Sequence, residues 1–405
     1  MKQKFVKYFK GDTAIWLIIF LLAIFSMLTV YSATGTLAYK KMGGNTSYFL
    51  FRHMAFLLFG IGITFIVHNI SYKIYYSLSQ LLLYISIPLL AWTLFKGVSL
   101  NEAARWITLP GTGLSFQTSD FAKFALIMYV ARLLSSNQEN IQDPKVAFKP
   151  ILIWVLIVCG LILPANFSTA AMLFAICLVL MFIGRIRVLH LAGLVGVGVV
   201  AIAIFVAIAW NMPNQGRVAT WKVRIENYLG DGSGDNYQTN QSKIAIVNGG
   251  LFGKGPGNST QRNFLPHPYS DFIYSIIIEE YGLLGGLFVL LLYLFLMYRV
   301  GAIVRKSQRT FPAFLVIGLA FSLVFQALIN MGVAVNVFPV TGQTLPFVSM
   351  GGTSIIFTSG ALGIILSVSR TVQPKTESPD GEAIIDETED QYADNINLDD
   401  DIEML

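Results

Sequence analysis

Long apolar runs recur along the chain from residue 13 to residue 369, separated by short polar segments. A helix that crosses the hydrocarbon core of a membrane needs about 20 apolar residues, because each residue spans about 1.5 Å of a core about 30 Å thick. The pattern predicts about ten membrane-spanning helices, near residues 13–33, 48–70, 74–95, 117–134, 150–165, 168–184, 188–210, 272–298, 313–334 and 349–369. We therefore expect an all-α, polytopic integral membrane protein.

Composition supports this class and excludes others. Hydrophobic residues make up 55% of the 405 residues and charged residues only 13%, whereas about 25% charged residues is usual for a soluble domain. The net charge of +5 does not indicate nucleic-acid binding, because the basic residues lie between apolar runs and form no continuous stripe. Cys159 and Cys177 both lie inside apolar runs, so neither a disulfide framework nor a zinc cluster is expected.

Lysine and arginine residues predict the orientation. With the N-terminus placed in the cytoplasm, most of them fall in the short cytoplasmic connections, as the positive-inside rule requires. Both termini are then cytoplasmic, and the long loop 211–271 is extracytoplasmic. We divide the chain into a transmembrane domain, residues 1–372, and a tail, residues 373–405. The tail carries 12 of the 23 acidic residues and one lysine without apolar periodicity, so we predict a disordered cytoplasmic segment.

Four acidic residues lie at or within predicted spans: Asp120, Asp271, Glu279 and Glu280. Ionisable groups are costly there and are candidates for function. Asp271 opens the eighth span, where it could cap the helix. Alternatively, it could act as a general base that faces a substrate hydroxyl in an outer cavity. Glu279 and Glu280 lie about two turns further in, and we expect at least one of them to form a structural salt bridge.

Two basic residues could meet an anionic substrate. Lys123 follows Asp120 by three residues on the same helix face, so it could form an intrahelical pair or present a cation at a cavity wall. Arg105 carries a guanidinium suited to bidentate phosphate contact. Because Trp106 follows it, an interfacial anchor is the alternative role.

No nucleotide or resident metal site is indicated by the motifs. The segment NGGLFGKGPGNS looks like a phosphate-binding loop, but Gly255 follows Lys254 where serine or threonine is required. The four histidines lack metal-ligand spacing. A site at the outer face would suit a substrate that carries its own activation, such as a lipid-linked pyrophosphate.

Four separated blocks resemble one family, the SEDS (shape, elongation, division and sporulation) proteins, over about residues 10–370. The blocks are AARWITL, FQTSDFAKF, the stretch from GGLFGKGPGNS to DFIYSIIIEEYGLLGG, and NVFPVTGQTLPFVSMGGTS. They are similar to the family's ARRWI, QPSEFAK, GxGxGNS with DFIF-EE-G, and PTTG-LPFISYGGSS patterns. The GNS segment favours a cell-division member over an elongation member.

The resemblance implies a peptidoglycan glycosyltransferase that polymerises lipid II at the outer face of the cytoplasmic membrane, at the division septum. Asp271 matches the family's catalytic aspartate. Its implied role is to deprotonate the 4-hydroxyl of the acceptor sugar, which attacks the anomeric carbon of the donor and expels undecaprenyl pyrophosphate. The other blocks imply a set of substrate-binding residues, namely Arg105, Asp120, Lys123, Gly257, Asn258, Ser259, Ser349, Gly351 and Gly352.

The resemblance also implies partners and leaves room for a divalent cation, Mg2+ or Mn2+, which would neutralise the leaving group. The partners are lipid II, undecaprenyl-pyrophosphate-linked glycan, a class B penicillin-binding protein that supplies the transpeptidase, and other division proteins, without nucleic acid or nucleotide. Three residues depart from the family pattern: Asn166 replaces an acidic residue, His267 replaces a glutamate near Asp271, and Asp120 replaces a glutamate and keeps the carboxylate on a side chain one carbon shorter. The second change places in doubt any metal site that uses that glutamate.

Three other functions remain open. Paired charges within the spans would also suit a lipid II flippase or another transporter of lipid-linked glycans. The acidic tail would suit a non-enzymatic division scaffold that recruits partners. A different lipid-linked glycan ligase or polymerase would share the topology, and the closing LPFVSMGGTS block argues against it only through its resemblance to the family pattern.

Overall fold

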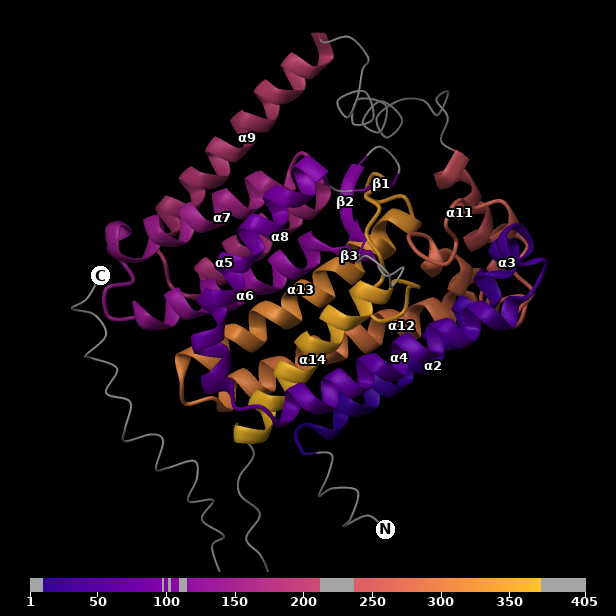
Figure 1. The fold of residues 1–405 in the computed structure, drawn as a ribbon, viewed down its shortest axis with the longest axis horizontal. Helices are drawn as coiled ribbons and strands as arrows, with labels where there is room; N and C mark the ends of the chain where they lie inside the picture. Colours follow the sequence, from indigo (N-terminus) through magenta and orange to yellow (C-terminus); the bar gives the residue numbers. More distant parts are fainter. Residues whose placement is uncertain (1–9, 97, 101–102, 109–114, 212–236, 373–405) are drawn as a thin grey trace, which may run out of the picture. The chain divides into compact units, whose positions relative to one another are not determined.

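The computed structural model describes residues 10–96, 98–100, 103–108, 115–211 and 237–372 (Figure 1). The predicted acidic tail, residues 373–405, lies outside the described residues, as does the part of the predicted outer loop from residue 212 to residue 236.

Helices occupy every predicted span. Seven helical segments of the described chain are long and apolar enough to cross a membrane: α2 (Thr13–Ala33), α4 (Thr46–Asn69), α5 (Tyr72–Lys96), α7 (Lys149–Ile162) with the π-helical turn before it (Pro144–Phe148), α12 (Ile273–Lys306), α13 (Thr310–Ala334) and α14 (Gly352–Val372). The remaining predicted spans correspond to α6 (Thr118–Ser136), α8 (Phe167–Ile183) and α9 (Val188–Asn211). The expected all-α, multi-pass membrane fold is confirmed.

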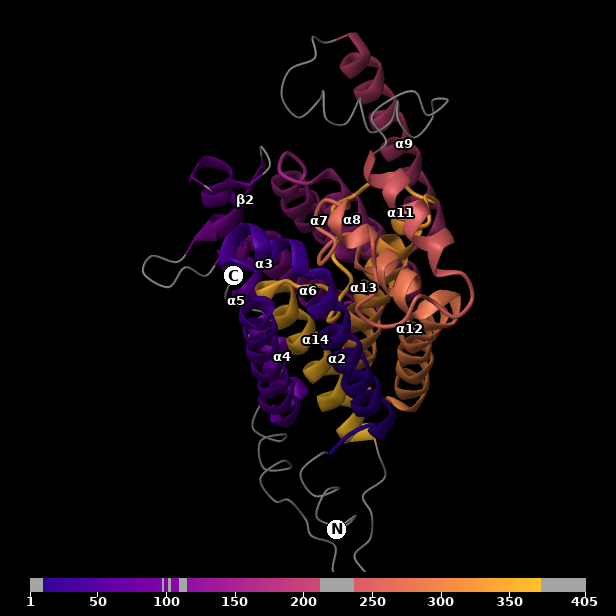
Figure 2. The same cartoon turned by 90° about the vertical axis from the view of Figure 1, so that its right-hand side faces the viewer.

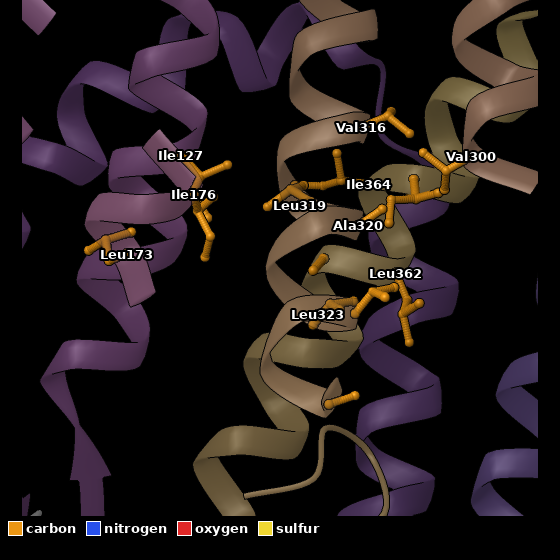
Figure 3. Close-up of a cluster of buried hydrophobic side chains, with 14 of the residues drawn as sticks. Ile127, Leu173, Ile176, Val300, Val316, Leu319, Ala320, Leu323, Leu362 and Ile364 are labelled. Carbon is orange, nitrogen blue, oxygen red and sulfur yellow. The ribbon is translucent and has the colours of Figure 1, made fainter. Parts of the chain in front are cut away.

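Helix α13 lies at the centre of the packing. It contacts α6 and α8 on one side and α12 and α14 on the other, and buried side chains from all five helices meet along it (Figure 3). Gly318 allows a close approach, because a Cβ atom at this position would lie 2.9 Å from side-chain carbons of Ile127 and Leu180. Figure 1 shows α13 and α14 between the pair α2 and α4 and the pair α7 and α8.

One end of the helix bundle is fastened by Asp12. Its Oδ1 accepts a hydrogen bond from the backbone N–H of Ala14 at 2.9 Å, which caps α2, and its Oδ2 pairs with Arg299 Nη2 of α12 at 2.5 Å. The backbone N–H of Asp12 donates to Ser369 Oγ of α14 at 2.9 Å. The start of α2 therefore lies beside the last turns of α14 (Figure 2).

At the opposite end of the spans, the structure contains short elements that the sequence did not predict. A three-stranded antiparallel sheet has the order β1 (Val98–Leu100), β2 (Ala103–Thr108), β3 (Ser115–Gln117). Helix α3 (Gly35–Met42) follows α2 directly. The predicted loop 211–271 contains a helix, α11 (Tyr237–Gly249), which packs on α12, and a single 3-10 turn, η2 (Gln261–Asn263).

Candidate functional site

The segment Tyr269–Asp271, directly before α12, is held at three successive carbonyl groups. The Tyr269 carbonyl accepts a hydrogen bond from the Met350 N–H at 2.9 Å. The Ser270 carbonyl accepts from Ser349 Oγ at 2.7 Å. The Asp271 carbonyl accepts from Asn330 Nδ2 at 2.8 Å. The last turns of α13 and the α13–α14 connection, residues 335–351, therefore fix the backbone beside Asp271.

The Asp271 carboxylate is partly exposed, and its Oδ1 accepts a hydrogen bond from Ser270 Oγ at 2.9 Å. Helix α12 begins at Ile273 with Phe272 in the N-cap position. Asp271 thus lies one residue before the N-cap residue. A general base must reach the hydroxyl whose proton it takes, and the partial exposure of Asp271 leaves this residue accessible from outside the helix bundle.

Two residues with aromatic rings, His267 and Tyr269, lie shortly before Asp271 in the chain. Tyr269 Oη and His267 Nδ1 lie 3.3 Å apart, and the two rings meet edge to face. Burial raises the pKa of the Tyr269 phenol above its ordinary value, and the negative charge of Asp271 raises it further. His267, which replaces the glutamate of the family pattern, is therefore engaged with a phenol.

The α13–α14 connection is folded tightly against this segment. Ser349, which is 2% exposed, accepts a hydrogen bond from the Leu345 N–H at 2.8 Å while it donates to Ser270. Phe347 is buried and has a φ of +65°, a conformation that is costly for a bulky side chain. At Gly352, a Cβ atom would lie 2.8 Å from the Phe56 ring, so a larger residue here would displace that ring of α4. Gly351 beside it is partly exposed.

Asp120 and Lys123 form the predicted intrahelical pair, with 3.7 Å between Lys123 Nζ and Asp120 Oδ1. Lys123 Nζ also donates to Gln326 Oε1 of α13 at 2.7 Å. All three side chains line a small pocket between α6, α13 and α14. The sequence left two alternatives for Lys123, an intrahelical pair or a cation at a cavity wall. The structure shows both.

Gln326 and Asn330 were not singled out by the sequence. They lie one turn apart on α13, and both bond to the α13–α14 connection: Gln326 Nε2 donates to the Thr344 carbonyl at 2.9 Å, and Asn330 Nδ2 donates to the Gln343 carbonyl at 2.7 Å. Neutral amides match no motif and carry no charge. The only signal was two amides spaced four residues apart in an otherwise apolar span.

Glu279 and Glu280 anchor the glycine loop, residues 250–260, to the N-terminal part of α12. Glu279 is fully buried and accepts hydrogen bonds from Lys254 Nζ at 2.8 Å, Ser259 Oγ at 2.5 Å and Thr260 Oγ1 at 2.8 Å. Glu280 accepts from the Ser259 N–H at 3.3 Å. The predicted structural salt bridge is thus the pair of Glu279 with Lys254.

A second contact from Glu280 reaches α2. Its carboxylate accepts a hydrogen bond from Ser32 Oγ, and Arg262 Nη1 donates to the same hydroxyl at 2.9 Å. The charges of Glu280 and Arg262 are therefore joined through one serine, and α2, the glycine loop and α12 meet at this point.

The glycine loop also exchanges backbone hydrogen bonds with α12. The N–H groups of residues 254 and 255 donate to the carbonyls of Glu279 and Glu280, and the N–H groups of residues 283 and 284 donate to the carbonyls of Gly250 and Leu251, at 2.9 to 3.3 Å. Gly282, with φ +71°, interrupts the helix where the loop enters. A Cβ atom on Gly282 would lie 2.2 Å from the Leu251 carbonyl oxygen.

This arrangement separates the residues of the GNS segment. Gly257 and Asn258 are exposed, and Asn258 Nδ2 donates to the Lys254 carbonyl at 3.0 Å. Ser259 is 3% exposed and donates to Glu279. The exposed pair is open to a ligand, whereas the Ser259 hydroxyl anchors the loop.

Arg105 lies in β2, and the structure describes its backbone only. Trp106, the next residue, pairs with Gln117 of β3, directly before α6. The sheet therefore places the strand that carries Arg105 beside the start of the helix that carries Asp120 and Lys123.

A metal centre built by the protein is not evident in the part of the chain that the structure describes. No group of three or more histidine, cysteine, aspartate or glutamate side chains there could hold an ion. Asn166, another departure from the family pattern, caps α8 by accepting a hydrogen bond from the Thr169 N–H at 3.3 Å.

Comparisons with known proteins agree with this fold. A family model for FtsW, RodA and SpoVE, described as cell cycle proteins, matches residues 12–374. The probable peptidoglycan glycosyltransferase FtsW of Trichlorobacter lovleyi is 33% identical over 365 residues, 88% of this chain and 93% of that protein. Stage V sporulation protein E of Bacillus subtilis is 33% identical over 371 residues, 89% of this chain and 97% of that protein.

Two solved structures are similar along most of their length. The rod shape determining protein RodA of Thermus thermophilus has a TM-score of 0.65 and 25% identity, covering 90% of this chain and 98% of that chain. A chain of a peptidoglycan synthase complex that coordinates polymerization and crosslinking has a TM-score of 0.71 and 25% identity, covering 90% and 99%.

Proposed function

The chain belongs to the FtsW, RodA and SpoVE family of cell cycle proteins, and from this premise we propose that it is a peptidoglycan glycosyltransferase that polymerises lipid II at the outer face of the cytoplasmic membrane. One observation carries the chemical part of the proposal. Asp271 presents a partly exposed carboxylate on a segment whose three carbonyl groups are each held by a hydrogen bond.

The reaction joins two lipid-linked sugars. The 4-hydroxyl oxygen of the acceptor lipid II attacks the anomeric carbon of the donor glycan. As the new bond to that oxygen forms, the bond from the anomeric carbon to the pyrophosphate breaks, and undecaprenyl pyrophosphate leaves with the electron pair. The hydroxyl proton passes to the Asp271 carboxylate. General base catalysis of this kind contributes about 100- to 10,000-fold to a rate.

Basic groups near the site suit the anionic pyrophosphate. Lys123 lines the pocket between α6, α13 and α14, and the strand that carries Arg105 lies beside the start of α6. In the proposal, these two cations hold the pyrophosphates, with the exposed Gly257 and Asn258 as further contacts. A fixed positive charge stabilises a leaving group most strongly where water is excluded.

The described residues do not fit a divalent cation held by the protein alone. Among the described residues no group of three or more histidine, cysteine, aspartate or glutamate side chains could hold an ion, whereas Mg2+ and Mn2+ prefer several carboxylate, carbonyl or water oxygens. We therefore derive no step through a cation.

The proposal also includes the setting of the reaction. We place both termini in the cytoplasm, because the basic residues favour that side, and the site at the outer face and the division septum. We assign a class B penicillin-binding protein as partner, with other division proteins. The support is the similarity to a chain of a peptidoglycan synthase complex that coordinates polymerization and crosslinking.

The test is polymer formation from lipid II by the purified protein with its class B partner. Wild type should form polymer, and Asp271→Asn should form none while it binds lipid II as tightly as wild type. Asp143→Asn is the matched control, because Asp143 is an exposed aspartate that caps the turn before α7, and asparagine caps equally well. Full activity of Asp271→Asn would refute the proposed chemistry. A flippase would instead lose translocation on substitution of Asp120, Lys123 or Glu279 and tolerate Asp271→Asn.

A further inference from the structure

One polar stripe on α13 connects the two charged parts of the proposed site. Gln326 and Asn330 are spaced four residues apart, so their side chains lie on one helix face. Gln326 accepts the hydrogen bond from Lys123 Nζ at 2.7 Å, and Asn330 donates to the Asp271 carbonyl at 2.8 Å. Each of these amides therefore touches a different residue that the proposed reaction uses.

The same two amides also hold one stretch of the α13–α14 connection. Asn330 donates to the Gln343 carbonyl at 2.7 Å and Gln326 to the Thr344 carbonyl at 2.9 Å. Both amides are at most 4% exposed, so water does not compete for these donors. Gln343 and Thr344, two neighbouring residues of the connection, are thereby fixed to α13 by the same amides that contact Asp271 and Lys123.

These contacts are directional. A side-chain amide that donates from one nitrogen to two carbonyls sets the position of both, and a buried carbonyl that loses its donor is costly. Asn330 thus fixes the Asp271 main chain relative to α13, and Gln326 fixes the Lys123 ammonium relative to the same helix. The two anchoring amides, Gln326 and Asn330, are about one helical turn apart on α13.

We infer that Asn330 is a positioning residue for the Asp271 carboxylate and that Gln326 is the corresponding positioning residue for the Lys123 ammonium, so that α13 sets the distance between the base and the pyrophosphate contact. This inference rests on the proposed function. Neither amide touches the reacting atoms, so the effect of each passes through the residue that it holds.

The two roles predict different kinetic defects. Loss of the Asn330 amide should displace the base and lower kcat, since a shift of about 1 Å can cost about 100-fold. Loss of the Gln326 amide should release Lys123 and weaken ground-state binding of the pyrophosphate, which raises KM with a smaller change in kcat.

The experiment measures kcat and KM for lipid II polymerisation by Asn330→Leu, Asn330→Ala and Gln326→Leu in the complex with the class B partner, with rates expressed per lipid II-binding protein. Leucine keeps the side-chain volume and removes the amide, whereas alanine leaves space for water. Should both Asn330 variants fail to fold, Ser349→Ala removes the neighbouring hydrogen bond to the Ser270 carbonyl and tests the same positioning. Asn137→Leu and Gln138→Leu are the controls, because these amides bond to carbonyls at the far end of α6.

The expected result is a fall in kcat of about 10- to 100-fold for the Asn330 variants with KM within about twofold of wild type, and a rise in KM for Gln326→Leu. A merely structural role would lower the amount of lipid II-binding protein and leave kcat per binding protein unchanged, which would overturn the inference. If wild type forms polymer, Asp271→Asn is inactive and the Asn330 variants are fully active, this inference is refuted and the proposed function stands. Wild type without polymer would refute the proposed function, and the inference with it.

Discussion

Lys254 Nζ and Glu279 Oε1 form an ion pair of 2.8 Å between the glycine loop and α12, in which the glutamate side chain is fully buried and the lysine side chain is 30% exposed. The two Glu279 oxygens together accept hydrogen bonds from five groups, of which the lysine is one. The carboxylate is therefore the centre of the contact, and the lysine is one of its donors.

This asymmetry predicts unequal effects of two substitutions. Glu279→Gln should destabilise the protein by about 3–5 kcal/mol, because the amide nitrogen would face hydrogen-bond donors and the lysine would lose its partner. Lys254→Met should cost only about 1–3 kcal/mol, since the carboxylate keeps its other donors. Thermal unfolding in detergent micelles measures both, and a lower melting temperature for Lys254→Met than for Glu279→Gln would contradict the prediction.

Gly253 and Gly257 offer a matched pair of glycines with φ +81° and +79°. A Cβ atom on Gly253 would lie 2.2 Å from the Glu280 carbonyl oxygen, whereas one on Gly257 would meet nothing within 4 Å. Gly257→Ala should therefore cost only the conformational penalty of about 1–2 kcal/mol. Gly253→Ala should also displace the loop from α12 and lower the yield of folded protein. Equal melting temperatures for the two variants would show that the close approach does not matter.

Asp12 allows the contributions of a cap and an ion pair to be separated. Asp12→Asn keeps a side-chain oxygen for the cap and removes the charge that pairs with Arg299. Because the Arg299 side chain is 35% exposed, this ion pair contributes only about 0–1 kcal/mol to stability. Asp12→Ala removes both, and should cost about 1 kcal/mol more than Asp12→Asn. The comparison is made by thermal unfolding, and identical stability of the two variants would argue against a cap at α2.

The pKa of Tyr269 should report the charge of Asp271. Burial is the larger cause of the raised pKa, and the negative charge of Asp271 raises it further. Asp271→Asn should therefore lower the phenol pKa toward its ordinary value near 10. Because the folded-state pKa is above the unfolded one, the neutral phenol stabilises the fold below about pH 10, and this contribution is lost as the pH rises further. A 19F NMR titration of fluorotyrosine at residue 269 measures the shift, and an unchanged pKa in Asp271→Asn would contradict the prediction.

The spans were predictable because their length and apolar character are imposed by the membrane, and every predicted run became a helix. The short strands were not, since six residues or fewer give too little periodicity. Helix α11 was missed because its sequence, YQTNQSKIAIVNG, is polar and lies beside a glycine-rich stretch.

Within the site, charged residues were found from the sequence and neutral ones were not. Asp271, Asp120 and Lys123 stood out because charge is costly in a span. Asn330 and Gln326 escaped notice because their importance lies in which carbonyl each one contacts. Ser259 was expected at a substrate, and its hydroxyl bonds to Glu279, a tertiary contact that no local pattern encodes.

The shared backbone ladder between the glycine loop and α12 also constrains how the chain is assembled during synthesis. Residues 250–255 leave the ribosome before residues 279–284, with which they exchange hydrogen bonds. Until α12 is made, those groups of the loop can bond only to water or to other parts of the chain. The N–H groups of residues 283 and 284, just past Gly282, bond to the loop and not to α12 itself. The loop therefore reaches its final position only after α12 has been made.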